Sequence, residues 1–566
     1  MAMTRRKFLD TTAAAGLAGV GAGLLGGCGS SSASGPSTLF VNGSIYVDAS
    51  TKVASLLVQG GTVIGADVDP AGWPGAEVVD LQGAAIYPGF IDSHMHLVEV
   101  GIFERVGIPV FGTTNGDQVA RALAPRIKPD MKVIFGAGVN PPDYDAWSLA
   151  DLARIDEVTG NRVAIVFDRL GHNCVVNSFT MQKFEVESKP VPFGGKVVRE
   201  AGRPTGMFRE AAMNMVGTQV FAEFDDADVK AGAEALAARW AQKGYTGLVD
   251  LMGATGLRLM RPGIFRELER EGKLPLRVHY CYTLFGLKDL EVAATFIGED
   301  TDLVRFVGGK LFVDGAFAGG QAWTSWPHVL PAGSHGLPQV TTNDAQEPDL
   351  NVNRIVARAE ALGMNMHYHV QGDLAIKAVL DALDLVLQSK GVLRATHTLI
   401  HVAYPTDDLI AQLSAINARA GGDHVVATTQ PGFWEVEADT QQYYGTRALE
   451  AYPLKQLIDS GVSVGISTDF AVSPEEFTPP TAIMRVAATG GSYPAFHPPV
   501  TVQDVVQCLT VGSARTTGSR DVGTLHVGQK ADMVAYATDL YLVPPEEMTS
   551  GNPAVVSTWV GGNKTG

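Results

Sequence analysis

Two histidines separated by one residue follow an apolar run near position 90. The run, Tyr87-Pro-Gly-Phe-Ile-Asp-Ser-His-Met-His96, is typical of a buried strand that ends in His94 and His96. Alternate side chains of a strand point to the same face, so both imidazoles would project together and could bind one metal ion. Because a His-x-His pair is common by chance, this interpretation depends on what the rest of the chain supplies.

Eight short apolar runs separated by helical stretches are predicted to be the core strands of the middle of the chain. They are Ala85–His96, Thr246–Leu251, Leu276–Tyr282, Val304–Val313, Met364–His369, His397–Val402, Val425–Gln430 and Val462–Asp469. The alternation favours a parallel sheet, and eight units favour a closed (β/α)8 barrel over residues 86–514. Residues of about 100–225 fit none of the units, and we interpret them as an α/β insertion after the first barrel strand, with its own strand at Val163–Asp168.

Side chains able to bind a metal ion end most of these runs. They are His94 and His96 on the first, Lys310 in the fourth, His369 on the fifth, His401 on the sixth and Asp469 on the eighth. The carboxyl ends of barrel strands converge on one site, so we expect these groups to meet. Taken singly, His369 could be a core histidine and Asp469 a helix cap. His367 lies on the same face of the strand as His369. We prefer His369 as the metal ligand because a loop-like segment directly follows it.

Lys310 lies inside an apolar run, where a lysine is readily deprotonated. The neutral amine can react with carbon dioxide to give a carbamate, an anionic oxygen ligand able to bridge two metal ions. Lys310 is therefore a candidate both for metal binding and for catalysis.

The two ends of the chain have separate roles in this interpretation. Residues 38–85 and 515–566 alternate β-rich runs with turns, and we expect them to form one small β-sandwich domain. Residues 1–28 resemble a twin-arginine export signal (Thr4-Arg-Arg-Lys-Phe-Leu9) that ends in a lipoprotein box, with Cys28 as the lipidation site. Residues 29–37 would be a flexible tether. We therefore expect a protein of the cell envelope that contacts the membrane only through a lipid anchor; the alternative is a plain exported protein with an incidental Cys28.

The net charge argues against one class of partner, and the cysteines argue against a disulfide framework. The formal net charge is −17 and no basic run is present, which argues against binding to nucleic acid. Cys174, Cys281 and Cys508 lie in apolar segments, so we expect buried thiols and no disulfide framework. The sequence leaves both a monomer and a homo-oligomer open.

The order and context of these motifs resemble the amidohydrolase superfamily over essentially the whole chain after the signal, and within it the branch typified by N-substituted formamide deformylase. The matching segments are Pro88–His96, Gly171–Ser178, Gly202–Glu210, Lys310–Gly315, His369–Asp373 and Gly523–Asp532. The resemblance implies that one or two divalent metal ions, zinc by default, are bound by His94, His96, Lys310, His369, His401 and Asp469. The chain departs from the branch at Ile400, where relatives usually have an acid, and at Ala316–Trp323. Both departures lie beside the site, which leaves the substrate range open.

The expected activity is hydrolysis of a non-peptide C–N bond in a small amide, N-formyl compound or cyclic amide. A metal-bound water, its pKa lowered towards about 7, would attack the carbonyl. Asp469 would take the water proton and deliver it to the leaving nitrogen. His172 and Asn177 are candidates to hold the substrate carbonyl, and Trp323 could line an apolar pocket; packing roles are the alternative for all three. Ester or lactone hydrolysis at the same site, and a catalytically silent surface binding or regulatory protein, are the alternative functions.

Overall fold

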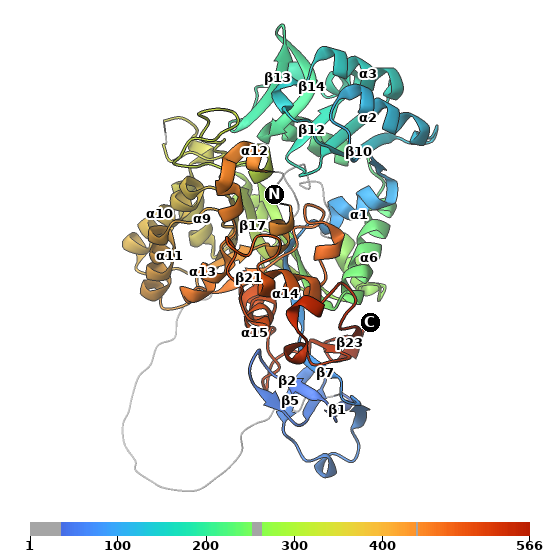
Figure 1. Ribbon diagram of the computed structural model, residues 1–566, viewed down its shortest axis with the longest axis vertical. Coiled ribbons are helices and arrows are strands. Elements are labelled where there is room, and N and C mark those ends of the chain that lie inside the picture. The colour runs from blue at the N-terminus through green and yellow to red at the C-terminus, as the bar shows by residue number, and fades with distance from the viewer. Residues whose placement is uncertain (1–34, 252–262, 344, 437–439, 566) are drawn as a thin grey trace, which may run out of the picture.

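The computed structural model describes residues 35–251, 263–343, 345–436 and 440–565 (Figure 1). The predicted export signal, the lipidation site Cys28 and most of the predicted tether lie outside these residues. Within the described ranges, the strands form four sheets, and none of the helices is long and apolar enough to cross a membrane.

The largest sheet has eight parallel strands and contains all eight predicted units. In chain order its strands are β8 (Phe90–Met95), β15 (Tyr245–Asp250), β16 (Arg277–Leu284), β17 (Val304–Phe312), β18 (Met366–Val370), β19 (His397–His401), β20 (Val425–Thr429) and β21 (Val464–Ile466). Each strand pairs with its neighbour in the chain order. The strands are buried along almost their whole length, as a parallel sheet covered by helices requires. The predicted (β/α)8 barrel is confirmed.

The first and last barrel strands are fastened together by buried polar groups. The Asp469 amide donates to the His94 carbonyl at 2.8 Å, and the Ser93 hydroxyl donates to the Ile466 carbonyl at 2.9 Å. The buried Asp92 carboxylate accepts from the Thr468 amide at 2.9 Å and from the Thr468 hydroxyl at 2.6 Å. Burial raises the pKa of Asp92 to about 6, although these hydrogen bonds act against the shift. The barrel is thereby closed between two segments that lie far apart in the sequence.

Helices surround the barrel in Figure 1. They are α1 (Leu97–Val106), α6 (Asp226–Gln242), α7 (Gly263–Arg270), α8 (Asp289–Ala294), α9 (Val352–Leu362), α10 (Asp373–Lys390), α11 (Asp407–Ala420), α13 (Leu454–Asp459), α14 (Pro480–Thr489), α15 (Val502–Gln507) and α16 (Ser513–Thr516). Local signals fix several of their starts: the Asn351 side chain caps α9 and the Thr406 side chain caps α11, each by accepting a backbone N–H.

The inserted segment forms a six-stranded sheet, shown at the top of Figure 1. Its order is β13 (Gly195–Glu200), β14 (Arg203–Glu210), β12 (Asn173–Val176), β11 (Val163–Asp168), β10 (Val133–Val139) and β9 (Ile108–Pro109). Only β11 is predicted from the sequence. One face of the sheet packs with α2 (Gly116–Leu123) and α3 (Leu149–Thr159) around a core of its own, and the other face joins the main core of the barrel.

Strands from both ends of the chain form two further sheets around one shared core. The smaller sheet orders β5 (Thr62–Ala66), β4 (Leu56–Gln59), β1 (Ser37–Val41) and β6 (Glu77–Asp80). The larger orders β24 (Asn563–Lys564), β23 (Val555–Val560), β22 (Met533–Tyr536), β7 (Ala85–Pro88), β2 (Ser44–Tyr46) and β3 (Lys52–Val53). This is the expected β-sandwich, and it lies at the end of the barrel opposite the insertion (Figure 1).

The apolar run predicted as one strand, Ala85–His96, is divided at Gly89. The residues before it form β7 of the sandwich, and those after it form β8 of the barrel. The Gly89 amide donates to the Asp532 carbonyl at 2.8 Å, and the Asp532 carboxylate pairs with Arg277 of β16 at 2.5 and 2.9 Å. A Cβ atom at position 89 would lie 2.0 Å from the Thr246 hydroxyl oxygen, so only glycine fits this junction.

We expect Gly89→Ala to lower the thermal-unfolding midpoint by a few degrees, because forcing an atom into a filled core costs roughly 1–3 kcal/mol. The matched control is Gly75→Ala, since a Cβ there meets nothing within 4 Å. The measurement is thermal unfolding followed by circular dichroism. Equal midpoints for the two variants would show that the junction tolerates a side chain.

Candidate metal centre

A pocket at the carboxyl end of the barrel is lined by all six predicted metal-binding residues. These are His94, His96, Lys310, His369, His401 and Asp469. They come from β8, from His96 directly after it, from β17, β18 and β19, and from the segment that follows β21. His367, the alternative on β18, is buried but does not line the pocket. The convergence of strand ends therefore brings the predicted set together.

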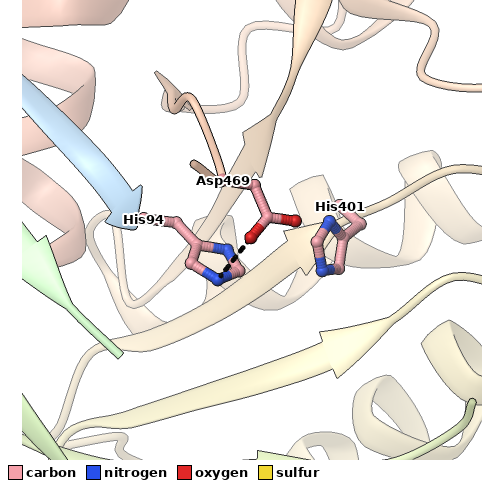
Figure 2. Close-up of side chains that lie close together, drawn as sticks. All are labelled: His94, His401 and Asp469. Atoms are coloured by element: carbon pink, nitrogen blue, oxygen red, sulfur yellow. Dashed lines mark ion pairs between the residues drawn. The ribbon is translucent and has the colours of Figure 1, made fainter. Parts of the chain in front are cut away.

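His94, His401 and Asp469 form the centre of the cluster, and one ligand atom of each lies within 4.8 Å of the others. Figure 2 shows the Asp469 carboxylate between the two imidazoles. One carboxylate oxygen of Asp469 lies 3.3 Å from His94 Nε2 and 3.1 Å from His96 Nε2. The centroid of the His369 ring lies 4.7 Å from the centroid of the His401 ring, so a further imidazole lies beside the cluster.

Several polar atoms of the cluster are buried without a hydrogen-bond partner. They are both ring nitrogens of His94, Nε2 of His369 and Nζ of Lys310. Buried polar groups are normally paired, because leaving them unpaired costs free energy. Coordination of a divalent ion would satisfy these lone pairs, and a set of imidazoles with a carboxylate suits zinc, iron, manganese or cobalt. The residues present therefore fit a metal ion.

Neighbouring side chains orient the imidazoles. His369 Nδ1 lies 3.1 Å from an Asp314 carboxylate oxygen, and His401 Nδ1 lies 3.0 Å from the Gln430 amide oxygen. His96 Nδ1 lies 3.3 Å from a Glu99 carboxylate oxygen. Metal-binding histidines usually engage such partners through the second ring nitrogen, which fixes the ring and its tautomer.

The sequence analysis assigns no role to Asp314, Gln430 or Glu99. Asp314 is held in turn by the backbone amides of Trp323 at 2.9 Å and Gly372 at 2.9 Å. The sequence signal for Asp314 is its place in the Lys310–Gly315 motif. Gln430 and Glu99 contact their histidines only in the folded chain, so no sequence signal marks them.

Burial sets the protonation of most of the cluster. Burial lowers the pKa of His94 and of His369 well below the usual value, and lowers the pKa of His401 to about 3. These imidazoles are neutral at pH 7, the form that binds metals. Burial also lowers the pKa of Lys310 to about 8.

The Asp469 and His96 pair behaves differently. Burial alone would raise the pKa of Asp469, but His94 and the hydrogen bond with His96 hold that pKa well below its usual range. Burial alone would lower the pKa of His96, whereas its hydrogen bonds with Asp469 and Glu99 raise it to about 10. Metal binding at His96 would therefore displace a proton.

The backbone is strained at two of the strand ends that carry the cluster. His401 and Val402 have φ of 78° and 49°, and Asp469 has φ of 49°. Left-handed values are uncommon for residues other than glycine, and a β-branched valine is a clear outlier. Such strain persists only where the surroundings fix the conformation, and it is concentrated at functional sites.

His172, a predicted substrate-binding residue, lines the pocket. Its Nδ1 lies 2.8 Å from a Glu210 carboxylate oxygen, and its ring centroid lies 5.1 Å from that of His369. Glu210 also accepts from the Ala316 amide at 3.0 Å, so it joins the insertion to the loop after β17.

The structure does not bring the other two predicted substrate-binding residues to the pocket. The Asn177 side chain caps α4 (Ser178–Lys183) by accepting from the Thr180 amide, and it donates to the Arg162 carbonyl at 2.9 Å. The Trp323 ring packs against the core, while its amide holds Asp314. Asparagine is a favoured helix cap, which accounts for the position of Asn177.

Comparison with known proteins agrees with this geometry. N-substituted formamide deformylase of Arthrobacter pascens is 25% identical over 521 residues, which are 87% of this chain and 92% of that protein. Protein LONG AFTER FAR-RED 3 of Arabidopsis thaliana is 24% identical over 557 residues, 93% of this chain and 91% of that protein. The crystal structure of an uncharacterized metal-dependent hydrolase from Pyrococcus horikoshii OT3 has the same fold: its TM-score is 0.69 at 21% identity, over 90% of this chain and 99% of that one. A model described as the amidohydrolase family matches residues 77–565, from β6 through the insertion and the barrel to the last strand, and the chain therefore belongs to the amidohydrolase family.

Proposed function

We propose that this protein is a metal-dependent hydrolase of a non-peptide C–N bond in a small amide, N-formyl compound or cyclic amide. The observation that carries the proposal is the group of buried imidazole and amine nitrogens without a hydrogen-bond partner around Asp469 at the carboxyl end of the barrel. The name of the Arthrobacter pascens relative, a deformylase of N-substituted formamides, supports a C–N bond as the target.

His94, His96, His369, His401 and Asp469 would hold one or two divalent ions, with zinc as the first candidate from the donor set. A divalent ion in such a site supplies Lewis-acid activation of a carbonyl oxygen and of a water molecule. Asp469 is ionised at neutral pH because its pKa is held low, so it can take the proton of the attacking water and pass it to the leaving nitrogen.

His172 would bind the carbonyl oxygen of the substrate. Glu210 fixes its Nδ1 edge, and the ring lines the pocket beside His369. The insertion therefore holds the His172 ring where it could contact a substrate carbonyl bound at the strand ends.

The direct test is hydrolysis of a panel of N-formyl, N-acyl and cyclic amides by the metal-loaded protein, together with matched esters and lactones. We expect turnover of at least one amide class, loss of turnover after removal of the metal by a chelator, and recovery on adding zinc. Turnover of esters alone would replace this proposal with an esterase or lactonase.

His94→Ala and His369→Ala should each lose bound metal and activity while remaining folded, because both side chains lie at strand ends and not in the barrel core. Elemental analysis and circular dichroism are the measurements. His526→Ala, which alters a half-exposed histidine of the tail, is the matched control and should keep its metal. Full metal content in either site variant would remove that residue from the ligand set.

Asp469→Asn should keep most of the metal, since the amide oxygen can still coordinate, yet kcat should fall by roughly 10²–10⁴-fold, the usual loss for a general acid–base group. The low-pH arm of the rate profile should persist in the variant, because the pKa of Asp469 is held well below its usual range and the arm then reports the activated water. If Asp469 serves only as a cap, asparagine would serve equally well and turnover would be near normal.

We further propose that Lys310 is carbamylated: its neutral amine attacks the carbon of carbon dioxide and releases a proton. The amine is fully buried and has a pKa of about 8, which leaves a useful neutral fraction near neutral pH. Lys310→Ala should lose most activity and regain part of it with short carboxylic acids, which supply the missing oxygens. Absence of rescue together with one metal ion per chain in the unmodified protein would contradict a carbamate at Lys310 that bridges two metal ions.

A further inference from the structure

One wall of the pocket consists of phenylalanine side chains that the proposed chemistry does not use. We call it the phenylalanine wall; it comprises Phe103 of α1, Phe111 after β9, Phe135 of β10, Phe167 of β11 and Phe221 of α5 (Gly217–Phe221). These five side chains line the same pocket as the metal centre. Phe103 lies on α1, directly after the first barrel strand, and the other four lie between β9 and α5 of the inserted segment.

The alternation of the inserted strands places these rings. Parallel pairing sets Phe135 opposite Ile165 and Ala137 opposite Phe167, so the two rings lie on the same face of the sheet. The residues of opposite parity, among them Ile134 and Val166, pack on the other face with α2 and α3. The face that carries the rings is therefore turned to the barrel and the pocket.

The rings contact one another edge to face. The ring centroids of Phe103 and Phe111 are 6.4 Å apart, with an interplanar angle of 88°. Those of Phe103 and Phe135 are 5.8 Å apart at 86°, and those of Phe135 and Phe167 are 5.8 Å apart at 89°. Phe111 is 60% exposed at the mouth, whereas Phe135 and Phe167 are buried. A Cβ atom on Gly138 would lie 2.4 Å from the Phe111 ring, so this glycine lets the ring rest across β10.

The acids beside the wall are already engaged by the protein. Asp168 accepts from the His172 amide at 3.0 Å, from the Asn173 side chain at 2.7 Å and from the Tyr144 hydroxyl at 3.0 Å. Glu99 pairs with His96. The wall thus offers an apolar, ring-lined surface, and Arg169, two residues after Phe167, also lines the pocket.

We propose that the phenylalanine wall binds an uncharged aryl group of the substrate and thereby sets its carbonyl at the metal centre. Edge-to-face ring clusters favour an added aromatic ring over an aliphatic one of the same size. The proposal names a substrate class for the proposed hydrolase and rests on it for the nature of the reacting bond, but binding of the aryl group requires no turnover.

The test is calorimetric binding of ketones to the metal-loaded protein, since a ketone in which CH₂ replaces the amide nitrogen cannot be hydrolysed. Benzylacetone should bind about tenfold or more tightly than butanone, because the phenyl ring would leave water. Phe111→Ala should weaken benzylacetone binding about fivefold and leave butanone binding unchanged. Phe111 is exposed, so the variant is expected to fold; Phe496→Ala, at a 41% exposed ring that does not line the pocket, is the matched control.

Equal affinity for benzylacetone and butanone, or equal effects of Phe111→Ala and Phe496→Ala, would overturn the proposal. Equal affinity for the cyclohexyl analogue would overturn the preference for an aryl group. Tighter binding of the para-carboxylate analogue would overturn the uncharged character and assign recognition to Arg169. Selective benzylacetone binding without turnover of any amide would support the wall while contradicting the hydrolase, so the two proposals fail separately.

Discussion

The backbone hydrogen bond from the Asp469 amide to the His94 carbonyl, 2.8 Å long, joins the last barrel strand to the first. Asp92 reinforces this closure through both the amide and the hydroxyl of Thr468. The two strand ends then bring a carboxylate and several imidazoles into a space where the nitrogens of His94 find no hydrogen-bond partner. A slip of one residue in this pairing would turn Asp469 away from the histidines, because side chains alternate along a strand. The metal centre therefore depends on closure of the barrel, and occupation by an ion would stabilise that closure in return.

The three parts of the chain contribute different things to the site. The barrel strands supply the metal-binding side chains, and the insertion supplies His172 and the phenylalanine wall from one face of its sheet. The sandwich lies at the opposite end (Figure 1), where the buried pair between Arg277 and Asp532 fastens it to β16. We infer that chemistry and substrate choice can vary separately, since they reside on different sheets.

The sequence predicts much of this arrangement because its signals are local. Continuous apolar runs bounded by turn residues reveal the eight barrel strands, and histidines or acids at their ends reveal the metal-binding set. The division of one run at Gly89 is not predicted, because apolar residues continue on both sides of Gly89 and the two halves join different sheets only in the folded chain. Strand β10 is missed because Gly136 and Gly138 interrupt its pattern. Asp92 and Asp314 contact residues on or just after other strands, so no local pattern reveals their roles. Nor does a local pattern show whether Asn177 caps a helix or binds a ligand. Export and lipidation at Cys28 stay predictions.

Anomalous X-ray scattering from crystals of the protein, recorded above and below the absorption edge of the metal found by elemental analysis, would locate the bound ion. An anomalous peak is expected at about 2.0–2.2 Å from a nitrogen of His94 and an oxygen of Asp469, the usual coordination distances of zinc to nitrogen and oxygen. Absence of a peak at this point in metal-replete crystals, or a peak only at the other buried histidines His279 and His367, would contradict a metal centre at His94 and Asp469.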